Sequence, residues 1–148
     1  MEQIIALAAD HGGYELKNEI KRHLEERGIA VRDFGTNGPE SVNYPDYAHP
    51  LCVAVANGEC RLGILVCGTG IGMSMAANKH RGIRAACCSD TYSARLTREH
   101  NDANVLCLGG RVIGTGLALD MVDLFLATEF AGGRHQKRVD MLTALDNQ

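Results

Sequence analysis

The sequence lacks the features that mark membrane and secreted proteins. Its 148 residues contain no apolar run near the ~18 residues that a membrane-spanning helix requires. The chain starts with Met-Glu-Gln and a short apolar run that ends at Asp10, without the basic and long apolar regions of a signal peptide. We therefore expect a cytoplasmic protein that has no signal peptide and does not engage membranes.

Basic charge is also scarce. The formal net charge is -3 and the pI is about 6.0, unlike the basic footprint of a nucleic-acid-binding domain, so we expect no nucleic-acid partner. One local basic cluster is present, Arg134-His135-Gln136-Lys137-Arg138. A weakly acidic protein that binds an anion must concentrate its positive charge in such a place.

The six cysteines form no C-x-x-C pair, and cysteines and histidines lack the paired spacing of zinc ligands. Most of these cysteines lie in apolar segments, which is typical of reduced, buried thiols in the cytosol. We expect no disulfide framework and no metal site.

Strand-like and helix-like segments alternate along the chain. Short apolar runs predict strands at 3–9, 29–34, 62–66, 83–88 and 104–108. Helical periodicity and capping signals predict helices at 12–27, 45–57, 73–79, 91–100, 114–128 and 134–145. This alternation predicts one domain, residues 1–148, with a five-stranded parallel sheet between two layers of helices.

In open sheets of this kind, ligands bind beyond the carboxyl ends of the strands, where the strand order reverses. We expect the order 2-1-3-4-5, which puts that point between strands 1 and 3. The turns that leave these strands are Asp10-His11-Gly12-Gly13 and Cys67-Gly68-Thr69-Gly70-Ile71-Gly72, the most polar and glycine-rich in the chain. Topology and composition therefore predict the same crevice.

The second turn has G-x-G-x-G spacing, which is neither a dinucleotide fingerprint nor a Walker A loop. Its glycines let backbone N–H groups approach a ligand oxygen at a helix N-terminus, which suits a phosphate or an enediolate. A plain strand-to-helix turn explains the same glycines equally well.

Cys67 stands at the predicted ligand face, where a helix N-terminus favours the thiolate; a buried structural cysteine is the alternative. A cysteine phosphatase would need an arginine that closes the loop, but Met73 and Ser74 stand there instead.

Other polar residues each carry two interpretations. The pair Asp10-His11 could orient hydroxyl groups or help to move a proton. Alternatively, Asp10 is the N-cap of the first helix. His100-Asn101 ends a helix, where an imidazole often only neutralises the dipole. Arg134 and Arg138 share a helix face that suits a dianionic phosphate, although such faces are more often solvated. Arg111 has the same ambiguity.

Eight motifs occur in order along the chain: Asp10-His11-Gly12-Gly13-Tyr14, Tyr44-Pro45-Asp46-Tyr47, Cys67-Gly68-Thr69-Gly70-Ile71-Gly72, Ala76-Ala77-Asn78-Lys79, Ser93-Ala94-Arg95, Glu99-His100-Asn101-Asp102, Gly110-Arg111 and Gly132-Gly133-Arg134-His135. With these motifs the chain resembles, over essentially its whole length, the family of ribose-5-phosphate isomerase B, galactose-6-phosphate isomerase subunits and allose-6-phosphate isomerases.

The resemblance implies a Rossmann-like α/β/α sandwich, a phosphorylated sugar as substrate, a homodimer or tetramer, and no metal or other cofactor. It implies that Cys67 is the base that moves a proton between C1 and C2, and that Thr69 hydrogen-bonds near that carbon. His100 would open the sugar ring, with Asp10 near the ring oxygen. The remaining substrate contacts that it implies are His11, Tyr44, the amides of Gly68, Thr69, Gly70, Ile71, Gly72, Met73 and Ser74, and Asn101, Arg111, Arg134, His135 and Arg138.

Some relatives replace the cysteine and carry a glutamate base further along the loop. Met73 occupies that position here and cannot accept a proton, so Cys67 is the candidate base of this turn. The expected substrate pair is ribose 5-phosphate and ribulose 5-phosphate. The alternatives are an allose-6-phosphate or galactose-6-phosphate isomerase, or a non-catalytic sugar-phosphate-binding subunit, which the joint presence of Cys67, Thr69 and His100 disfavours.

His100 precedes strand 5 and so lies near the amino edge of the sheet, whereas Cys67 lies at the carboxyl edge. We therefore expect His100 and Asn101 to enter the site from a partner subunit, and the helix at 134–145 to pack on that partner.

Overall fold

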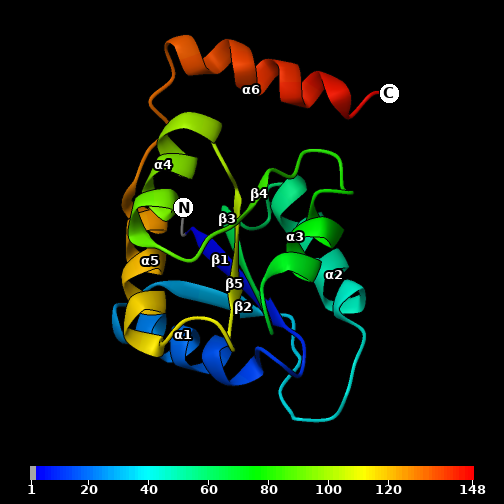
Figure 1. Cartoon of the computed structure of the whole chain (residues 1–148), viewed down its shortest axis with the longest axis vertical. Coiled ribbons are helices and arrows are strands. Elements are labelled where there is room, and N and C mark those ends of the chain that lie inside the picture. The colour runs from blue at the N-terminus through cyan, green and yellow to red at the C-terminus, as the bar shows by residue number, and fades with distance from the viewer. Residues whose placement is uncertain (1–2) are drawn as a thin grey trace.

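The computed structural model describes residues 3–148, in which strands and helices alternate and two consecutive helices come last (Figure 1). The strands are β1 (Ile4–Ala9), β2 (Ala30–Asp33), β3 (Leu62–Cys67), β4 (Ala85–Cys87) and β5 (Val105–Gly109). The helices are α1 (Tyr14–Glu26), α2 (Tyr44–Ala56), α3 (Ile71–Ala77), α4 (Thr91–Asn101), α5 (Thr115–Ala127) and α6 (Arg134–Leu145). The predicted Rossmann-like α/β class is confirmed.

The five strands are parallel, in the order β2-β1-β3-β5-β4. The predicted order was wrong for the last two strands, because β5 lies inside the sheet and β4 forms the edge. Every residue of β5 is buried, whereas the three residues of β4 are partly or fully exposed. A strand that is apolar on both faces gains most from a central position, so β5 takes it. The reversal point between β1 and β3 is unaffected.

The edge strand β4 is shorter than the predicted run of 83–88. Asparagine side chains take over pairing around it: Asn78 donates to the carbonyl of Ala85 and accepts from its N–H, at 3.0 and 2.8 Å. Asn104 accepts from the N–H of Arg84 and donates to the carbonyl of Gly82, both at 2.8 Å. These amides satisfy backbone groups that a sheet edge would otherwise expose.

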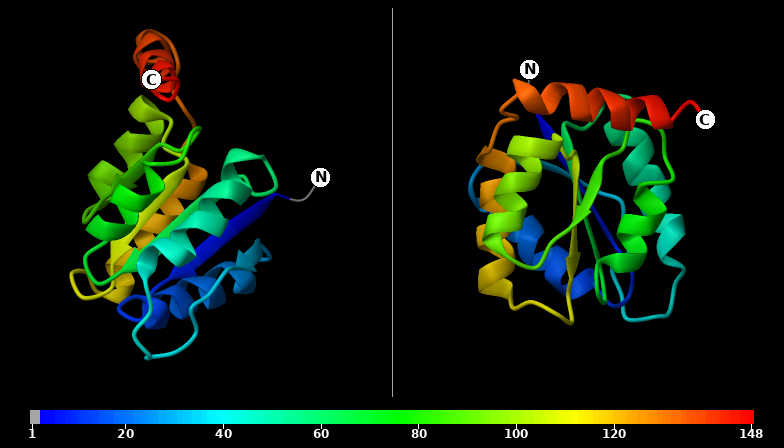
Figure 2. Two further views of the ribbon diagram at one scale, coloured as in Figure 1. Left: turned by 90° about the vertical axis from the view of Figure 1, so that its right-hand side faces the viewer. Right: turned by 45° about the horizontal axis from the view of Figure 1, so that its top comes forward.

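Helices cover both faces of the sheet (Figure 2), and each face carries its own apolar core. Helices α1, α4 and α5 cover one face, with Ile20 and Phe125 fully buried among them. Helices α2 and α3 cover the other face, with Leu51 and Met73 fully buried. None of the helices within residues 3–148 is long and apolar enough to cross a bilayer.

Helix α6 lies across the end of the sheet where the strands begin (Figure 1). The N–H of Ala131 donates to the carbonyl of Glu99 at the end of α4, and Asp146 accepts from the N–H of Gly82, which precedes β4. Val139 of α6 is buried, but Met141 and Leu145 are more than half exposed. Packing of α6 on a partner subunit stays a prediction.

Candidate active site

The turns that follow β1 and β3 lie against each other, as predicted. The N–H of Asp10 donates to the carbonyl of Val66 at 3.2 Å, and a Cβ on Gly12 would lie only 3.1 Å from the amide nitrogen of Gly68. A Cβ on Gly13 would overlap the carbonyl of Val66. Glycine is required here because the two backbones touch.

The turn after β5 lies against the Cys67 loop from the other side. The N–H groups of Gly110 and Arg111 donate to the carbonyls of Cys67 and Gly68, at 2.8 and 3.0 Å. The side chain of Arg111 passes over Gly68, where a Cβ would lie 3.4 Å from its guanidinium. Because β5 is the neighbour of β3, Arg111 brings a positive charge to the Cys67 loop.

Cys67 ends β3 with 5% of its surface exposed. Its Sγ accepts a hydrogen bond from the N–H of Gly70 at 3.1 Å. Gly70 has φ +83, the left-handed conformation that turns this amide back onto the sulfur. The N–H of Ile71 is held by Thr69 Oγ1 at 3.2 Å. A donor directed at Sγ stabilises a thiolate, which a proton-abstracting cysteine requires.

The amides of the loop divide into two groups. Those of Gly70 and Ile71 bind Cys67 and Thr69, and that of Ser74 donates to the carbonyl of Gly70 at 3.1 Å. Gly72 and Met73 lie in the first turn of α3, where an amide has no carbonyl partner within the helix. Three amides of the predicted donor set of Gly68 to Ser74, those of Gly70, Ile71 and Ser74, therefore already have partners within the loop. The Met73 side chain is fully buried, so this residue can offer substrate only its backbone.

Tyr44 reaches the same loop from the start of α2. A Cβ on Gly72 would lie 2.9 Å from its ring, and Tyr44 as a whole is 37% exposed. The tyrosine therefore lies beside the first turn of α3, and its role as a substrate contact stays a prediction.

Asp10 and His11 are both held by backbone N–H groups. Asp10 Oδ1 accepts from Gly12 at 2.9 Å, and α1 has Gly13 at its N-cap with no side-chain cap, so the N-cap interpretation of Asp10 was wrong. His11 Nδ1 accepts from the N–H of Val42 at 3.2 Å. That bond assigns the ring proton to Nε2. No motif in the sequence indicated Val42, because the contact depends on the path of a loop.

The other predicted residues form a second cluster around α6. The rings of His100 and His135 stack with centroids 4.2 Å apart, and Asn101 is the last residue of α4. The pKa of His135 is lowered from its ordinary value, first by desolvation and then by the charges of His100, Arg134 and Arg138. The negative charge of Glu99 acts in the opposite direction. Arg134 and Arg138 therefore bring positive charge to this cluster, which suits an anion.

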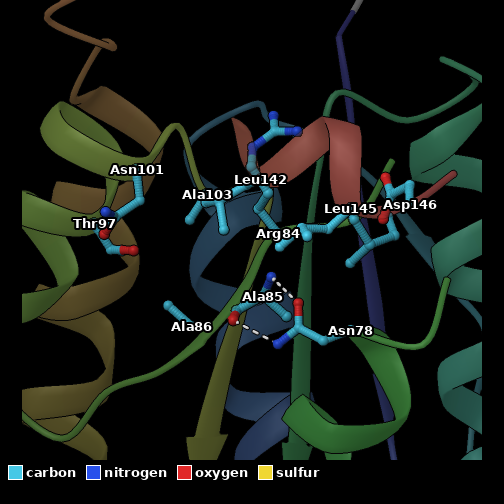
Figure 3. A pocket seen from close by; sticks show the side chains of 11 residues that line it. Asn78, Arg84, Ala85, Ala86, Thr97, Asn101, Ala103, Leu142, Leu145 and Asp146 are labelled. Carbon is cyan, nitrogen blue, oxygen red and sulfur yellow. Dashed lines mark hydrogen bonds between the residues drawn. The ribbon is translucent and has the colours of Figure 1, made fainter. Parts of the chain in front are cut away.

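This second cluster lies at the amino end of the sheet, whereas Cys67 lies at the carboxyl end (Figure 1). A cavity of about 430 Å³ lies beneath α6, with Asn101, Arg84 and Leu145 among its lining residues (Figure 3). Cys67 does not line it. Within one chain the structure thus gathers Asp10, His11, Tyr44, Arg111 and the Cys67 loop, and separately gathers His100, Asn101, Arg134, His135 and Arg138.

No cluster of three or more potential metal-ligating side chains occurs within residues 3–148.

Residues 5–142 match the family model described as Ribose/Galactose Isomerase. The chain belongs to the ribose/galactose isomerase family. The resemblance drawn from the motifs is thereby confirmed. The ribose-5-phosphate isomerase B of Escherichia coli (strain K12) is 53% identical over 144 residues, which cover 97% of each chain. A putative sugar phosphate isomerase of Bacillus subtilis (strain 168) is also 53% identical, over 94% of each chain.

Solved structures of this family share the fold. The ribose-5-phosphate isomerase B of Clostridium thermocellum is 54% identical, with a TM-score of 0.96 over 98% of both chains. That of Mycoplasma genitalium with bound ribulose-5-phosphate is 40% identical, with a TM-score of 0.95 over 100% of this chain and 99% of the other.

Proposed function

We propose that this chain interconverts ribose 5-phosphate and ribulose 5-phosphate, with Cys67 as the base. The observation that carries the proposal is the Sγ of Cys67, which accepts the N–H of Gly70 in the crevice at the reversal point of the sheet. The names of relatives more than 50% identical over nearly the whole chain support the substrate.

The chemistry requires a base and a place for negative charge. The Cys67 thiolate removes the proton from C2 of the open-chain aldose, and the electron pair moves onto O1 to give an enediolate. The O2 proton moves to O1, and the thiol returns its proton to C1, which leaves a carbonyl at C2. Each backbone donor aimed at the developing oxyanion is worth about 3 kcal/mol. The first-turn amides of Gly72 and Met73 are the proposed donors.

Neighbouring side chains have supporting roles in this scheme. Asp10, held by Gly12, is suited to direct the hydroxyl protons, and Thr69 lies two residues after Cys67 in the same loop. The ring of Tyr44 packs against Gly72, and the guanidinium of Arg111 brings a positive charge next to Gly68.

The ring-opening and phosphate groups are assigned to a second copy of the chain. His100, Asn101, Arg134, His135 and Arg138 lie at the end of the sheet opposite Cys67. A homodimer that sets the α4–α6 end of one protomer against the Cys67 loop of the other would complete two sites. His100 would then move the proton that opens the sugar ring, and the arginines would bind the phosphate. A tetramer would contain two such dimers.

The cysteines support a reducing compartment. All six are free thiols, and oxidation of Cys67 would remove the proposed base. We therefore assign the enzyme to the cytoplasm.

The purified chain tests the proposal directly. It is incubated in D₂O with ribose 5-phosphate, allose 6-phosphate and galactose 6-phosphate, and ketose formation and deuterium incorporation are followed by NMR. Preferred conversion of ribose 5-phosphate with solvent deuterium in the product is expected. Preference for a six-carbon phosphate would reassign the substrate, and tight binding without conversion would make the chain a non-catalytic binding subunit.

A further inference from the structure

Lys17 is a fully buried lysine beside the candidate site. Its side chain has 0% exposure, and its Nζ donates to both carboxylate oxygens of Asp33 at 2.8 Å and to Asn37 Oδ1 at 2.6 Å. Lysine is almost never fully buried unless it is paired. Replacing a buried ion pair with apolar residues is often neutral or stabilising, so stability alone is a weak reason for this arrangement.

The three partners belong to three segments that meet behind the crevice. Lys17 lies in the first turns of α1, directly after the Asp10–Gly13 turn, and its N–H donates to the carbonyl of Gly13. Asp33 is the last residue of β2. Asn37 is an exposed residue of the loop 34–43, which connects β2 to α2. Lys17 therefore ties this loop to the helix that follows the first site turn.

The loop 34–43 reaches the site at its far end. Its first part is fixed by backbone bonds at 2.7 Å, from Ala9 to the carbonyl of Gly35 and from Thr36 to the carbonyl of Ala9. Beyond Thr36, the bond to Lys17 holds Asn37, and the next contact with the site is the N–H of Val42 on His11 Nδ1 at 3.2 Å. The path of 37–42 leads from Asn37 to the Val42 donor, which directly precedes Asn43, the N-cap of α2.

The Val42 donor in turn selects the form of His11. An N–H directed at Nδ1 requires that nitrogen to be unprotonated, so Nε2 carries the proton and acts as a donor. A neutral His11 with a fixed Nε2–H is suited to donate to a sugar or phosphate oxygen in the crevice. Without Val42 in place, both tautomers of the ring become accessible.

We propose that Lys17 is a positioning residue that acts through Asn37. It fixes the loop 34–43 so that Val42 holds His11 as an Nε2–H donor before substrate binds. The ligand of His11 rests on the proposed function, but the tautomer of His11 in the free protein does not.

Asn37→Ala removes the hydrogen bond between Lys17 and the loop 34–43 but leaves the Lys17–Asp33 pair in place. Because Asn37 is exposed, the fold should persist. In ¹⁵N NMR of the substrate-free wild-type protein, His11 should appear as the single Nε2–H tautomer. In the variant it should appear as a mixture of tautomers. The KM for ribose 5-phosphate should rise about tenfold with kcat changed less than about twofold, because a binding contact is loosened without loss of the base.

Two matched variants separate positioning from general effects. Asn37→Asp retains an acceptor oxygen for Lys17 and should restore the wild-type spectrum and KM. Lys21→Met removes a second lysine, whose Nζ lies 3.5 Å from Asp33 Oδ2 but does not bond Asn37. This variant should change neither the tautomer of His11 nor the KM. Lys17→Met, checked for folding by circular dichroism, should reproduce the effect of Asn37→Ala.

A single Nε2–H tautomer of His11 in Asn37→Ala, with unchanged KM, would overturn the proposal whatever the behaviour of Lys17→Met. If the wild-type protein isomerises no sugar phosphate, the proposed function fails. The NMR comparison needs no substrate and still decides the role of Lys17.

Discussion

His100 lies flat against His135, with ring planes inclined by only 14°. The contact joins α4 to α6 and builds one group of polar residues at the amino end of the sheet. Cys67 and its amide donors stand at the carboxyl end. The two groups of predicted site residues therefore lie at opposite ends of the sheet in one protomer, and the proposed homodimer predicts complementation between chains.

Two inactive variants should rescue each other when mixed. Cys67→Ser lacks the proposed base, and His100→Ala lacks the proposed ring-opening group. Random pairing makes half of the dimers mixed, and each mixed dimer has one intact site of two, so about one quarter of wild-type activity should return. The measurement is ribose 5-phosphate turnover after joint unfolding and refolding of the two variants.

A mixture of Cys67→Ser with Cys67→Ala is the control and should stay inactive, because no intact site can form. If the Cys67→Ser and His100→Ala mixture also stays inactive while mass spectrometry detects mixed dimers, both residues act from the same chain.

Loss of the sulfur should affect catalysis far more than folding. Cys67→Ala should lower kcat by about 10²–10⁴-fold, the range for a general base, and abolish deuterium incorporation from D₂O. Cys60→Ala is the matched variant, since Cys60 is buried near the opposite end of β3. It should cost about 1 kcal/mol of unfolding free energy and leave kcat intact. Equal kcat in the two variants would exclude Cys67 as the base.

Gly70 should tolerate no side chain. Gly70 and Gly28 have positive φ angles of 83 and 73, and an alanine in that region costs about 1–2 kcal/mol. A Cβ on Gly70 would also lie 2.9 Å from the backbone of Leu108 and 3.0 Å from Cys87 Sγ, whereas one on Gly28 meets nothing within 4 Å.

Gly70→Ala should therefore move the donor to Cys67 and reduce kcat/KM by about 100-fold or more. Gly28→Ala should lower Tm with activity unchanged. Thermal melts and steady-state kinetics on both variants make the comparison, and full activity in Gly70→Ala would contradict the proposed role of its amide.

The Lys17–Asp33 pair should make unfolding sensitive to acid. Burial by itself raises the pKa of the Asp33 carboxyl. The net pKa is nevertheless lowered, because Asp33 accepts bonds from Lys17 and from the N–H of Gly35 and lies near the charges of Lys17 and Lys21. A depressed carboxyl pKa stabilises the fold above the unfolded value of about 4, and this contribution disappears as pH falls through the folded value.

Urea unfolding midpoints measured between neutral pH and pH 3 check this. The wild-type midpoint should fall with acid, and the fall should be smaller in Lys17→Met, where burial remains without its main opposing bond. An identical pH slope in both proteins would show that Asp33 gains nothing from Lys17.

Much of the site could be predicted because its signals are local. The Asp10 and Cys67 turns each follow a strand that its own apolar run identifies, and parallel strands bring their carboxyl ends to one edge. The separation of His100 from Cys67 follows from the same reasoning, because a residue that precedes a strand lies at the opposite edge from one that ends it. Helix α6 has the predicted bounds of 134–145.

Contacts between distant segments were decided only by the tertiary structure. The exchange of β4 and β5 depends on which strand gains more from burial on both faces, and it sets Arg111 over Gly68. The Val42 bond to His11 and the Lys17 bond to Asn37 depend on a loop path that no periodicity describes. Sequence alone determined the elements and the chemistry of each turn, because these arise from neighbouring residues. Strand order and the setting of His11 needed the folded chain, because they arise from competition among non-local contacts.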